Sequence, residues 1–430
     1  MVKIFTLIKA ILYVENIYLS GCQLIYQIVN RINNLPPIQE TMSQTLPLIT
    51  TFILLLLLTT TVTATTIGVT YTQTPTSPPP QQLIPLIQTL HITSIRLVNP
   101  NPNTIKSFTH TNISLFITIP NTLIPALSSN ISSANLWLYQ HVIPFYPRAR
   151  ISAISVGTNL LSHGDFTTLD MIVPAIRNVR NALNDIGIDK ITVSTTFSFL
   201  NIMTTSFPPS SAEFQEPVNR VVIKPLLEFL TETNSSFFVS LFPYYVYKLR
   251  PEIPIGFALF QEHAFNFRED TVTGVRYRNL FDQMVDAVIA AMAVAGHENI
   301  PIIVTETGWP CYDPLNEGEA RVVYSGMYLR GLLSHLNSGR GTPLRKEGPS
   351  EVYVYEMFDT NDTVSKGLSG DGIGVNWGFC YANMSTKFEI NFSNGSSVVT
   401  TNWVVKMFFV LFVGINCFSF GLGLSRLLIV

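Results

Sequence analysis

The stretch that decides the fold is Ile302-Ile303-Val304-Thr305-Glu306-Thr307-Gly308-Trp309-Pro310. An apolar run of β-type residues leads directly into a carboxylate, which is followed by a turn and an aromatic residue. In barrels of parallel strands, functional side chains stand at the C-terminal ends of the strands. We therefore expect Glu306 at the rim of such a barrel, in the place of a nucleophile.

Runs of the same kind recur along the chain and alternate with helical patterns. The runs are Ile67–Tyr71, Ser94–Val98, Ile113–Ile119, Ile151–Val156, Ile191–Ser194, Phe237–Phe242, Ile302–Thr305 and Val352–Met357. Helical patterns lie between them at Thr168–Ile186, Val221–Thr231, Leu280–Ala295 and Glu319–Leu336. Near-continuous apolarity is typical of parallel strands buried on both faces. The alternation predicts an α/β fold, a single (β/α)8 TIM barrel.

An open doubly wound sheet is the alternative architecture. Such a sheet should place a glycine-rich phosphate loop directly after the first strand. The residues there are Thr70-Tyr71-Thr72-Gln73-Thr74, which contain no glycine. The closed barrel is therefore the favoured interpretation.

Composition narrows the classes of function. The 430 residues are 47% hydrophobic and 13% charged, and the formal net charge is −2. This charge gives no electrostatic reason to expect nucleic acid as a partner. The 7 histidines do not cluster with cysteines or carboxylates, so neither a metal site nor a cofactor is predicted.

The N-terminal region has the pattern of a targeting segment. Phe52–Leu58 is apolar but too short to span a bilayer, and Val62-Thr63-Ala64 resembles a small-residue cleavage site. A signal peptide over residues 42–64 is therefore predicted, with Thr65 as the first mature residue. Residues 1–41 fit a signal peptide poorly, so they are either an upstream extension of the gene model or a genuine additional segment.

The predicted barrel domain, residues 65–390, is followed by a second special segment, residues 391–430. Asn391–Ser397 is rich in small polar residues, and Trp403–Val430 is apolar apart from Lys406 and Arg426. Small residues, a spacer and an apolar tail indicate a signal for a glycosylphosphatidylinositol (GPI) anchor. A C-terminal transmembrane tail is the alternative that this length permits.

The mature chain would keep two cysteines and several glycosylation triplets. The sequence leaves open whether Cys311 and Cys380 form a disulfide bond or remain thiols. Asn-x-Ser/Thr triplets begin at Asn112, Asn130, Asn234, Asn361, Asn383, Asn391 and Asn394. Together with a signal peptide they predict a secreted glycoprotein, on the extracellular side of the plasma membrane or in the cell wall.

Several strings follow one another in a characteristic order between residues 66 and 380. They are Ile67-Gly68-Val69-Thr70-Tyr71, Ile95-Arg96-Leu97, Phe207-Pro208-Pro209-Ser210, Phe242-Pro243-Tyr244-Tyr245, Asn279-Leu280-Phe281-Asp282, Glu306-Thr307-Gly308-Trp309-Pro310 and Asn376-Trp377-Gly378. Together they resemble the plant glycoside hydrolase family 17, the endo-1,3-β-glucanases. The resemblance implies a retaining hydrolase of callose-like β-1,3-glucan, in which two glutamates about 5–5.5 Å apart act as nucleophile and acid/base.

Under this resemblance Glu306 matches the nucleophile, whereas the acid/base position is changed. The family's Val-Gly-Asn-Glu string is matched by Val156-Gly157-Thr158-Asn159, which places Asn159 where the acid/base glutamate belongs. An amide has no acidic proton to give the leaving oxygen, and it cannot activate water. Because general acid–base help is worth about 10²–10⁴-fold, cleavage of a polysaccharide is expected to be impaired.

A second departure follows the eighth predicted strand. The family's Phe-Asn-Glu-Asn-x-Lys string is matched by Phe358–Thr363, so Thr360 and Thr363 replace an auxiliary glutamate and lysine. No other residue is an evident replacement acid. Asp165 and His163 have the character of solvated loop residues, and Glu356 lies about 13 Å deeper than Thr360 at the rise of a strand.

Aromatic residues at or near the strand ends are candidates for sugar binding, because their faces can bury the apolar C–H surface of a sugar ring. They are Tyr71, Phe242, Tyr244, Tyr245, Trp309 and Trp377. Packing in the core is the alternative role, and for Phe242 the two interpretations are equal.

These residues leave alternative functions open. The first is a glucan endo-1,3-β-glucosidase-like protein with impaired catalysis, and its rival is a non-catalytic, GPI-anchored protein that binds β-1,3-glucan. An active enzyme with an altered acid and a degenerate paralogue without ligand are further alternatives. In each case we expect a monomer, held at a membrane by a lipid anchor or by the C-terminal tail.

Overall fold

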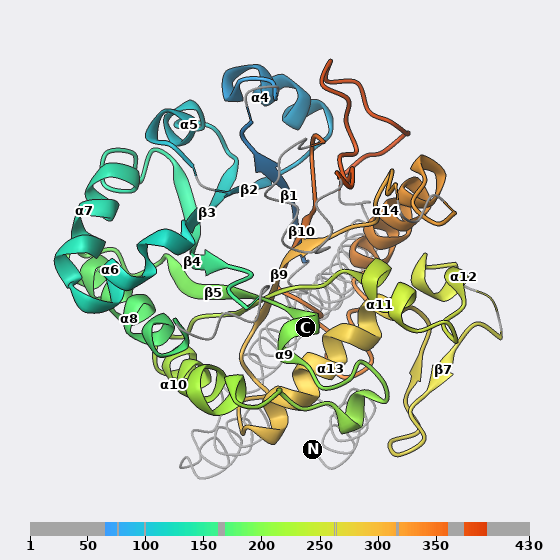
Figure 1. Ribbon diagram of the computed structural model, residues 1–430. Helices are drawn as coiled ribbons and strands as arrows, with labels where there is room; N and C mark the ends of the chain where they lie inside the picture. The colour runs from blue at the N-terminus through green and yellow to red at the C-terminus, as the bar shows by residue number, and fades with distance from the viewer. Residues whose placement is uncertain are drawn as a thin grey trace, which may run out of the picture. The chain divides into compact units, whose positions relative to one another are not determined.

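Eight parallel strands close into a barrel in the computed structural model, which describes residues 65–393 except 75–76, 99, 162–167, 262, 264, 315–317 and 360–373. Around the barrel the order is β1-β10-β9-β6-β5-β4-β3-β2, and β1 closes it by pairing with both β10 and β2. Helices surround the strands, as the view in Figure 1 shows. The predicted (β/α)8 barrel is therefore confirmed.

The barrel strands are β1 (Thr66–Thr72), β2 (Ser94–Val98), β3 (Ser114–Ile119), β4 (Arg150–Thr158), β5 (Thr192–Ser198), β6 (Phe237–Ser240), β9 (Ile302–Thr307) and β10 (Glu351–Val354). A small antiparallel pair, β7 (Arg268–Glu269) with β8 (Arg276–Tyr277), stands apart from the barrel. The barrel strands correspond to the eight predicted runs. The small pair is too short to leave a period-2 pattern, so the sequence did not indicate it.

The helices differ widely in length. They are α4 (Pro80–Thr89), α5 (Pro102–Ser107), α6 (Ile124–Ser129), α7 (Ile131–His141), α8 (Leu169–Asp185), α9 (Phe199–Ile202), α10 (Lys224–Glu232), α11 (Pro243–Leu249), α12 (Ile255–Ala258), α13 (Leu280–Val294) and α14 (Val322–Asn337), with 3-10 turns η1 (Asn121–Leu123) and η2 (Pro209–Ser211) and a π-helical turn η3 (Asn219–Ile223). The four helical patterns that the sequence predicts correspond to α8, α10, α13 and α14.

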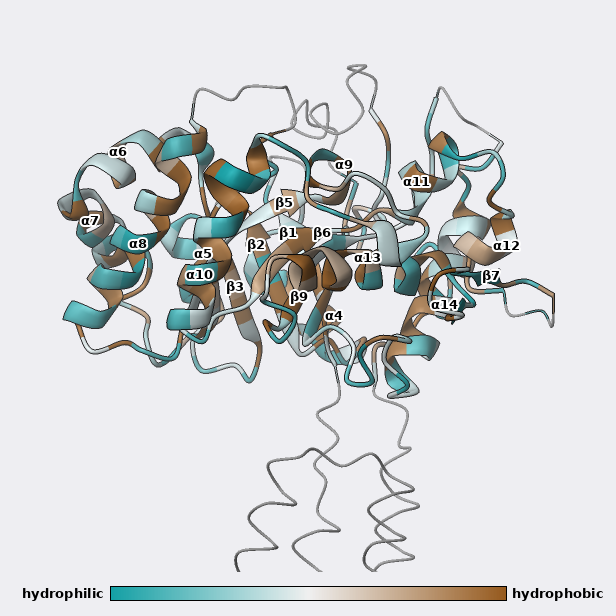
Figure 2. Ribbon diagram, turned by 90° about the horizontal axis from the view of Figure 1, so that it is seen from below, coloured by the Kyte–Doolittle hydropathy of each residue, from teal (hydrophilic) through white to brown (hydrophobic). Residues whose placement is uncertain are grey.

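Burial on both faces explains the apolar strands. Their outer faces pack under the helices, while Phe116, Ala153, Phe238, Ile303 and Tyr353 form a separate cluster of buried residues. The rings of Phe116 and Phe238 lie 5.0 Å apart, which is contact distance for aromatic side chains. Figure 2 shows the resulting hydrophobic strands and the two-sided helices around them.

Strand β6 ends earlier than the sequence suggested. The apolar run continues to Phe242, but the strand stops at Ser240 because Pro243 begins α11. Proline has no N–H for a strand ladder and is well suited to the first turn of a helix. The chain therefore passes from β6 into α11 through the two residues Leu241 and Phe242.

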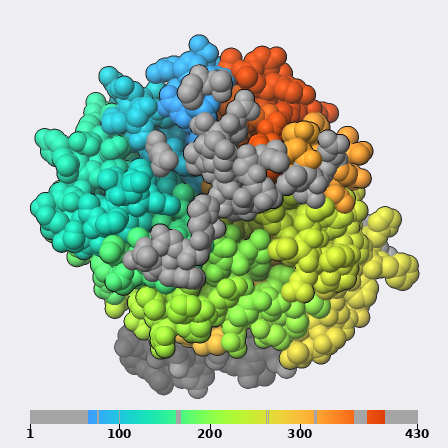
Figure 3. All heavy atoms as spheres, viewed as in Figure 1, coloured from blue at the N-terminus to red at the C-terminus, as the bar shows by residue number. Residues whose placement is uncertain are grey.

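The last described segment packs against the first helix. The N–H of Phe392 donates to the carbonyl oxygen of Leu90 at 3.0 Å, and the blue and red regions adjoin in Figure 3. Residues 1–41, the predicted signal peptide 42–64 and the tail from residue 394 lie outside the described residues. Within the described ranges, no helix combines the length and apolarity that a membrane crossing requires.

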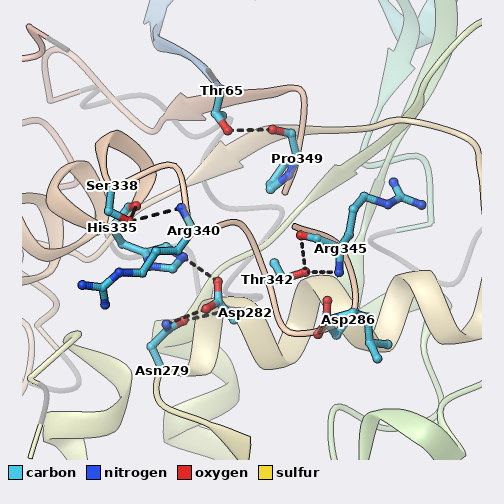
Figure 4. A network of polar contacts seen from close by, with 11 residues as sticks. Thr65, Asn279, Asp282, Asp286, His335, Ser338, Arg340, Thr342, Arg345 and Pro349 are labelled. Carbon is cyan, nitrogen blue, oxygen red and sulfur yellow. Dashed lines mark hydrogen bonds and ion pairs between the residues drawn. The ribbon is translucent and has the colours of Figure 1, made fainter. Parts of the chain in front are cut away.

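A polar network joins α13, α14 and the loop that leads into β10 (Figure 4). Asn279 caps α13 by accepting from the Asp282 N–H at 2.7 Å, and Asp282 also contacts His335 Nε2 at 2.8 Å. Farther along α13, Asp286 accepts from the Leu344 N–H at 2.9 Å. The network fixes the loop before β10, which is the strand that closes the barrel.

Burial of Asp286 should make stability depend on pH. Burial raises the pKa of this carboxyl from 3.8 to about 7, while the Thr342 hydroxyl and the Leu344 N–H offset burial only in part. A raised pKa means that its contribution to stability is complete below about pH 4 and is lost as pH rises to about 7. For Asp286→Asn we expect a flatter profile of unfolding free energy against pH.

Urea denaturation of both proteins between about pH 4 and pH 8 measures this difference. The difference in unfolding free energy between the two proteins should change by at most about 1.4 kcal/mol per pH unit. The wild type should lose stability relative to the variant as pH rises. Parallel profiles for the two proteins would contradict the assignment.

Candidate active site

Four strand ends bring their polar side chains together at the rim of the barrel. They are the ends of β2, β4, β6 and β9, which carry Arg96, Asn159, Ser240 and Glu306. Carboxyl ends of parallel barrel strands meet at one face, so residues distant in sequence become neighbours. The predicted positions Glu306 and Asn159 are thereby brought into contact.

Glu306 is held by a buried ion pair. Its Oε1 lies 2.5 Å from Arg96 Nη1, and the two side chains are 4% and 0% exposed. The second guanidinium nitrogen, Nη2, donates to the Thr158 hydroxyl at 3.1 Å. A buried charge is costly unless it is paired, so Arg96 fixes both the place and the orientation of the carboxylate.

The end of β4 is irregular, and this irregularity aims Asn159. The pairing of β4 with β5 shifts between Ser155 and Thr158, as in a β-bulge. Gly157 has φ +80° and Asn159 has φ +49°, which is left-handed backbone. Asparagine tolerates this conformation better than most residues that carry a Cβ.

A second asparagine fixes the same bend from outside. Asn121 in η1 accepts from the Thr158 N–H at 2.9 Å and donates to the Thr158 carbonyl oxygen at 3.0 Å. At Gly157 a Cβ would approach the ends of the Ile124 and Leu160 side chains to 2.9 Å, and its φ of +80° is a backbone conformation that other residues rarely adopt. The bend in β4 is therefore imposed by packing and by hydrogen bonds together.

The Asn159 amide bridges two of the strand ends. Its Nδ2 lies 3.4 Å from Glu306 Oε2, which is at the weak end of hydrogen-bond distances. The Ser240 hydroxyl oxygen lies 3.1 Å from Asn159 Oδ1 and 3.3 Å from the Phe197 carbonyl oxygen, and it can donate to either. The contact with Ser240 turns the amide so that its N–H groups face the carboxylate.

The turn after Glu306 depends on Gly308. A Cβ at this position would overlap the carbonyl oxygen of Tyr355 and would approach the Trp377 ring. The Tyr355 N–H donates to the Thr307 carbonyl oxygen at 2.8 Å. Because β9 and β10 come this close at the rim, glycine is the residue that lets the chain turn directly behind the carboxylate.

The predicted aromatic residues beside β6 and β9 form one cluster. Ring centroids of Phe242 and Trp377 are 5.0 Å apart, and those of Tyr244 and Trp309 are 5.1 Å apart. Trp309 Nε1 donates to the Glu319 carbonyl oxygen at 2.8 Å, and the Tyr244 hydroxyl donates to Asp313 at 2.9 Å. These contacts hold the rings at fixed angles.

Most of these rings are covered in the structure. Trp309, Tyr244 and Tyr71 are 1% exposed, and Phe242 and Trp377 are 4% exposed. The Tyr71 hydroxyl donates to the Pro78 carbonyl oxygen at 2.9 Å. Tyr245 and Tyr355, which pack against the same cluster, are only partly buried. The outer part of the cluster is therefore formed by these two tyrosines.

The end of β10 carries an ion pair that the sequence did not suggest. Lys387 Nζ lies 2.7 Å from Asp359 Oδ2, and Asp359 Oδ1 accepts from the Gly378 N–H at 2.9 Å. Lys387 thus supplies a cation after β10. In the family's string the lysine stands at the position that Thr363 occupies in this chain. Residues Thr360 and Thr363 lie outside the described residues, as do His163 and Asp165.

Cys311 and Cys380 are free, buried thiols. Cys311 Sγ contacts the Gly378 carbonyl oxygen at 3.3 Å. Burial raises the pKa of both thiols, that of Cys380 to about 12. Of the two open alternatives, the structure therefore contains unpaired thiols, which are held in the protonated form.

Arg96, Ser240 and Asn121 are the site residues to which the sequence gave no role. A signal for Arg96 was present, because an arginine inside an apolar strand is rarely buried without a partner. No comparable signal existed for Ser240 and Asn121, since serine and asparagine are common at strand ends and turns. Their contacts depend on which strands become neighbours.

The ion pair of Arg96 and Glu306 should be strongly coupled. Either Arg96→Met or Glu306→Leu leaves one buried charge unpaired, so each should lower the free energy of unfolding by about 3–5 kcal/mol. The double variant should lose much less than the sum, because it removes both charges. Urea denaturation of the four proteins measures this coupling.

An exposed pair in the same protein provides the control. Arg177 and Glu232 are 3.8 Å apart with side chains 46% and 65% exposed, so their coupling should be about 0–1 kcal/mol. Equal coupling energies for the two pairs would refute the role assigned to Arg96.

Comparisons with known proteins agree with this geometry. The model of "Glycosyl hydrolases family 17" matches residues 67–392. "Probable glucan endo-1,3-beta-glucosidase A6" of Arabidopsis thaliana is 33% identical over 79% of this chain and 70% of its own length. "Glucan endo-1,3-beta-glucosidase 12" of the same plant is 34% identical over 78% of this chain and 62% of its own.

A solved structure is also similar. It is a beta-1,3-glucanase and pollen allergen of Cryptomeria japonica, with a TM-score of 0.69 and 30% identity, covering 77% of this chain and 100% of that one. The family match extends over the whole described barrel, including the strand ends that carry Glu306 and Asn159. This chain belongs to glycosyl hydrolases family 17.

Proposed function

We propose that this chain acts on β-1,3-glucan in the manner of a glucan endo-1,3-β-glucosidase, with hydrolysis of the polymer impaired. The relatives' names supply the substrate class. The observation that carries the impairment is the amide of Asn159, whose Nδ2 lies 3.4 Å from Glu306 Oε2. In the family's mechanism, this neighbouring position belongs to the acid/base carboxyl.

The chemistry of the amide decides between binding and cleavage. A glucosyl oxygen is a poor leaving group and needs a proton as its bond to the anomeric carbon breaks. The N–H groups of Asn159 can donate a hydrogen bond to this oxygen but cannot transfer a proton at neutral pH. Glu306 can therefore be correctly placed while the polymer remains uncleaved.

A non-catalytic glucan-binding protein is the second candidate function. Its support is that Glu306 is engaged on both oxygens, by Arg96 at 2.5 Å and by Asn159 at 3.4 Å. The aromatic cluster supports either candidate, since Tyr245 and Tyr355 can bury sugar C–H surface while Phe242, Tyr244, Trp309 and Trp377 pack behind them. Tyr71 packs against Phe358 instead. Substrate contact at these positions is part of the proposal.

Restoring a carboxyl at position 159 should restore cleavage. We expect Asn159→Glu to raise the rate of hydrolysis of a soluble β-1,3-glucan by about 10²–10⁴-fold. Left-handed backbone at Asn159 disfavours glutamate, so Asn159→Asp is a second variant that tolerates this backbone but reaches less far. Release of reducing ends measures the rate.

Two controls make this result interpretable. Asn159→Gln adds the same length as glutamate without an acid, so it should leave hydrolysis as slow as before. Binding of the same glucan, measured by titration calorimetry, should persist in all these variants. Rapid cleavage by the unchanged protein, with no gain from Asn159→Glu, would mean that another group supplies the proton.

We also propose that the protein is secreted, N-glycosylated and held at the outer surface of the plasma membrane by a GPI anchor. The sequence patterns at residues 42–64 and 391–430 support this location. Five of the triplets start at asparagines that are exposed in the structure, namely Asn112, Asn130, Asn234, Asn383 and Asn391. Such exposure is a requirement for glycan attachment.

Enzymatic removal of the anchor tests the location. Phosphatidylinositol-specific phospholipase C should release the protein from intact cells that express it, because the lipid would be its only hold on the membrane. Retention after this treatment, together with release by detergent alone, would favour a transmembrane tail instead.

A further inference from the structure

We propose that this site transfers glucosyl groups between anions. The donor would be a β-glucoside whose aglycone leaves as a weakly basic anion, such as a nitrated phenolate or a carboxylate. The acceptor would be a nucleophile that is already anionic, such as a thiolate or a carboxylate. The inference rests on the proposed function, because it requires a glucosyl site with a nucleophile and without an acid/base.

The geometry leaves the nucleophile ready to react. Glu306 Oε1 is held tightly by Arg96 at 2.5 Å, whereas among the described residues the contact of Oε2 is the long one of 3.4 Å with Asn159. Oε2 is therefore the more weakly hydrogen-bonded of the two carboxylate oxygens. It faces Asn159, which occupies the acid/base position. A carboxylate fixed through one oxygen and loosely contacted at the other can attack without losing its ion pair.

The first step then needs no proton. Oε2 of Glu306 forms a bond to the anomeric carbon, while the bond from this carbon to the aglycone oxygen breaks. The electron pair of that bond leaves with the aglycone as an anion, to which the Asn159 amide can donate a hydrogen bond. The products are a glucosyl ester of Glu306 and a free phenolate or carboxylate.

The second step favours anions over water. Water must lose a proton as it attacks, and its usual acceptor is the acid/base carboxylate. In this chain the group at the acid/base position is the Asn159 amide, whose Oδ1 lies 3.1 Å from the Ser240 hydroxyl. An amide is too weak a base to accept the proton of the attacking water. An anionic acceptor brings its own electron pair, displaces Glu306 and regenerates the carboxylate with net retention at the anomeric carbon.

Substrate choice would therefore follow leaving-group acidity. A sugar hydroxyl leaves as a strongly basic alkoxide and would be rejected. A nitrated phenol leaves as a weakly basic anion and would be accepted. The same residues that impair hydrolysis of the polymer would select this second class of donor, so the altered site would have an activity of its own.

The experiment uses the full mature protein with dinitrophenyl β-glucoside and phenyl β-glucoside as donors and azide as the anionic acceptor. We expect a burst of about one dinitrophenolate per protein, followed by slow turnover, and a glucosyl ester mapped to Glu306 by mass spectrometry. Azide should raise the steady rate by about 10²-fold or more and yield β-glucosyl azide. The phenyl glucoside should not react.

Variants separate this activity from background hydrolysis. Glu306→Gln should abolish the ester, and Glu232→Gln should not, because Glu232 is on the exposed surface. In Asn159→Glu the burst and the effect of azide should disappear, since water can then complete the reaction. Retained thermal transitions show that each variant is folded.

Three results would overturn the inference. They are the absence of an ester with the dinitrophenyl donor, a steady rate that azide does not change, and cleavage of the phenyl glucoside at a comparable rate. The last would mean that another group of the chain supplies the proton. Binding of β-1,3-glucan without any ester would leave the proposed function intact, whereas an ester without glucan binding would contradict only that function.

Discussion

The ion pair between Arg96 and Glu306 is the constraint on which the candidate site depends. Both side chains are almost completely buried, and a single charge in that place would be strongly destabilising. The pair therefore determines where β2 and β9 stand relative to each other at the rim, although β1 and β10 lie between them in the barrel. Through Nη2, Arg96 extends the same constraint to Thr158 at the end of β4.

Once these strand ends are fixed, the neighbouring residues have little freedom. The bend at Gly157, held from outside by Asn121, turns Asn159 toward Glu306. Ser240 then orients the amide. Glu306 and Asn159 thus face each other at the rim, a carboxylate opposite an amide that accepts from Ser240 and donates toward Glu306.

The opposite end of the barrel strands serves stability. The network of Asp282, Asp286 and His335 connects two helices to the loop that enters β10 (Figure 4). At the start of β1, the Thr65 hydroxyl donates to the Pro349 carbonyl oxygen at 3.0 Å. Because β1 and β10 close the barrel, contacts at their amino ends support the ring of strands without touching the rim. This separation agrees with the general division of such barrels into a functional and a structural face.

The sequence by itself determined the architecture and the chemical type of the main site residues. Eight apolar runs alternating with helical patterns require a buried parallel sheet, and the Glu306 stretch identifies its functional rim. The end of β6 was misjudged by two residues, because Pro243 ends the strand where hydrophobicity alone would continue it. The structure decided the partners: Arg96 with Glu306, Ser240 with Asn159, and Lys387 with Asp359. These pairs join residues far apart in the chain, and only closure of the barrel brings them within hydrogen-bonding distance.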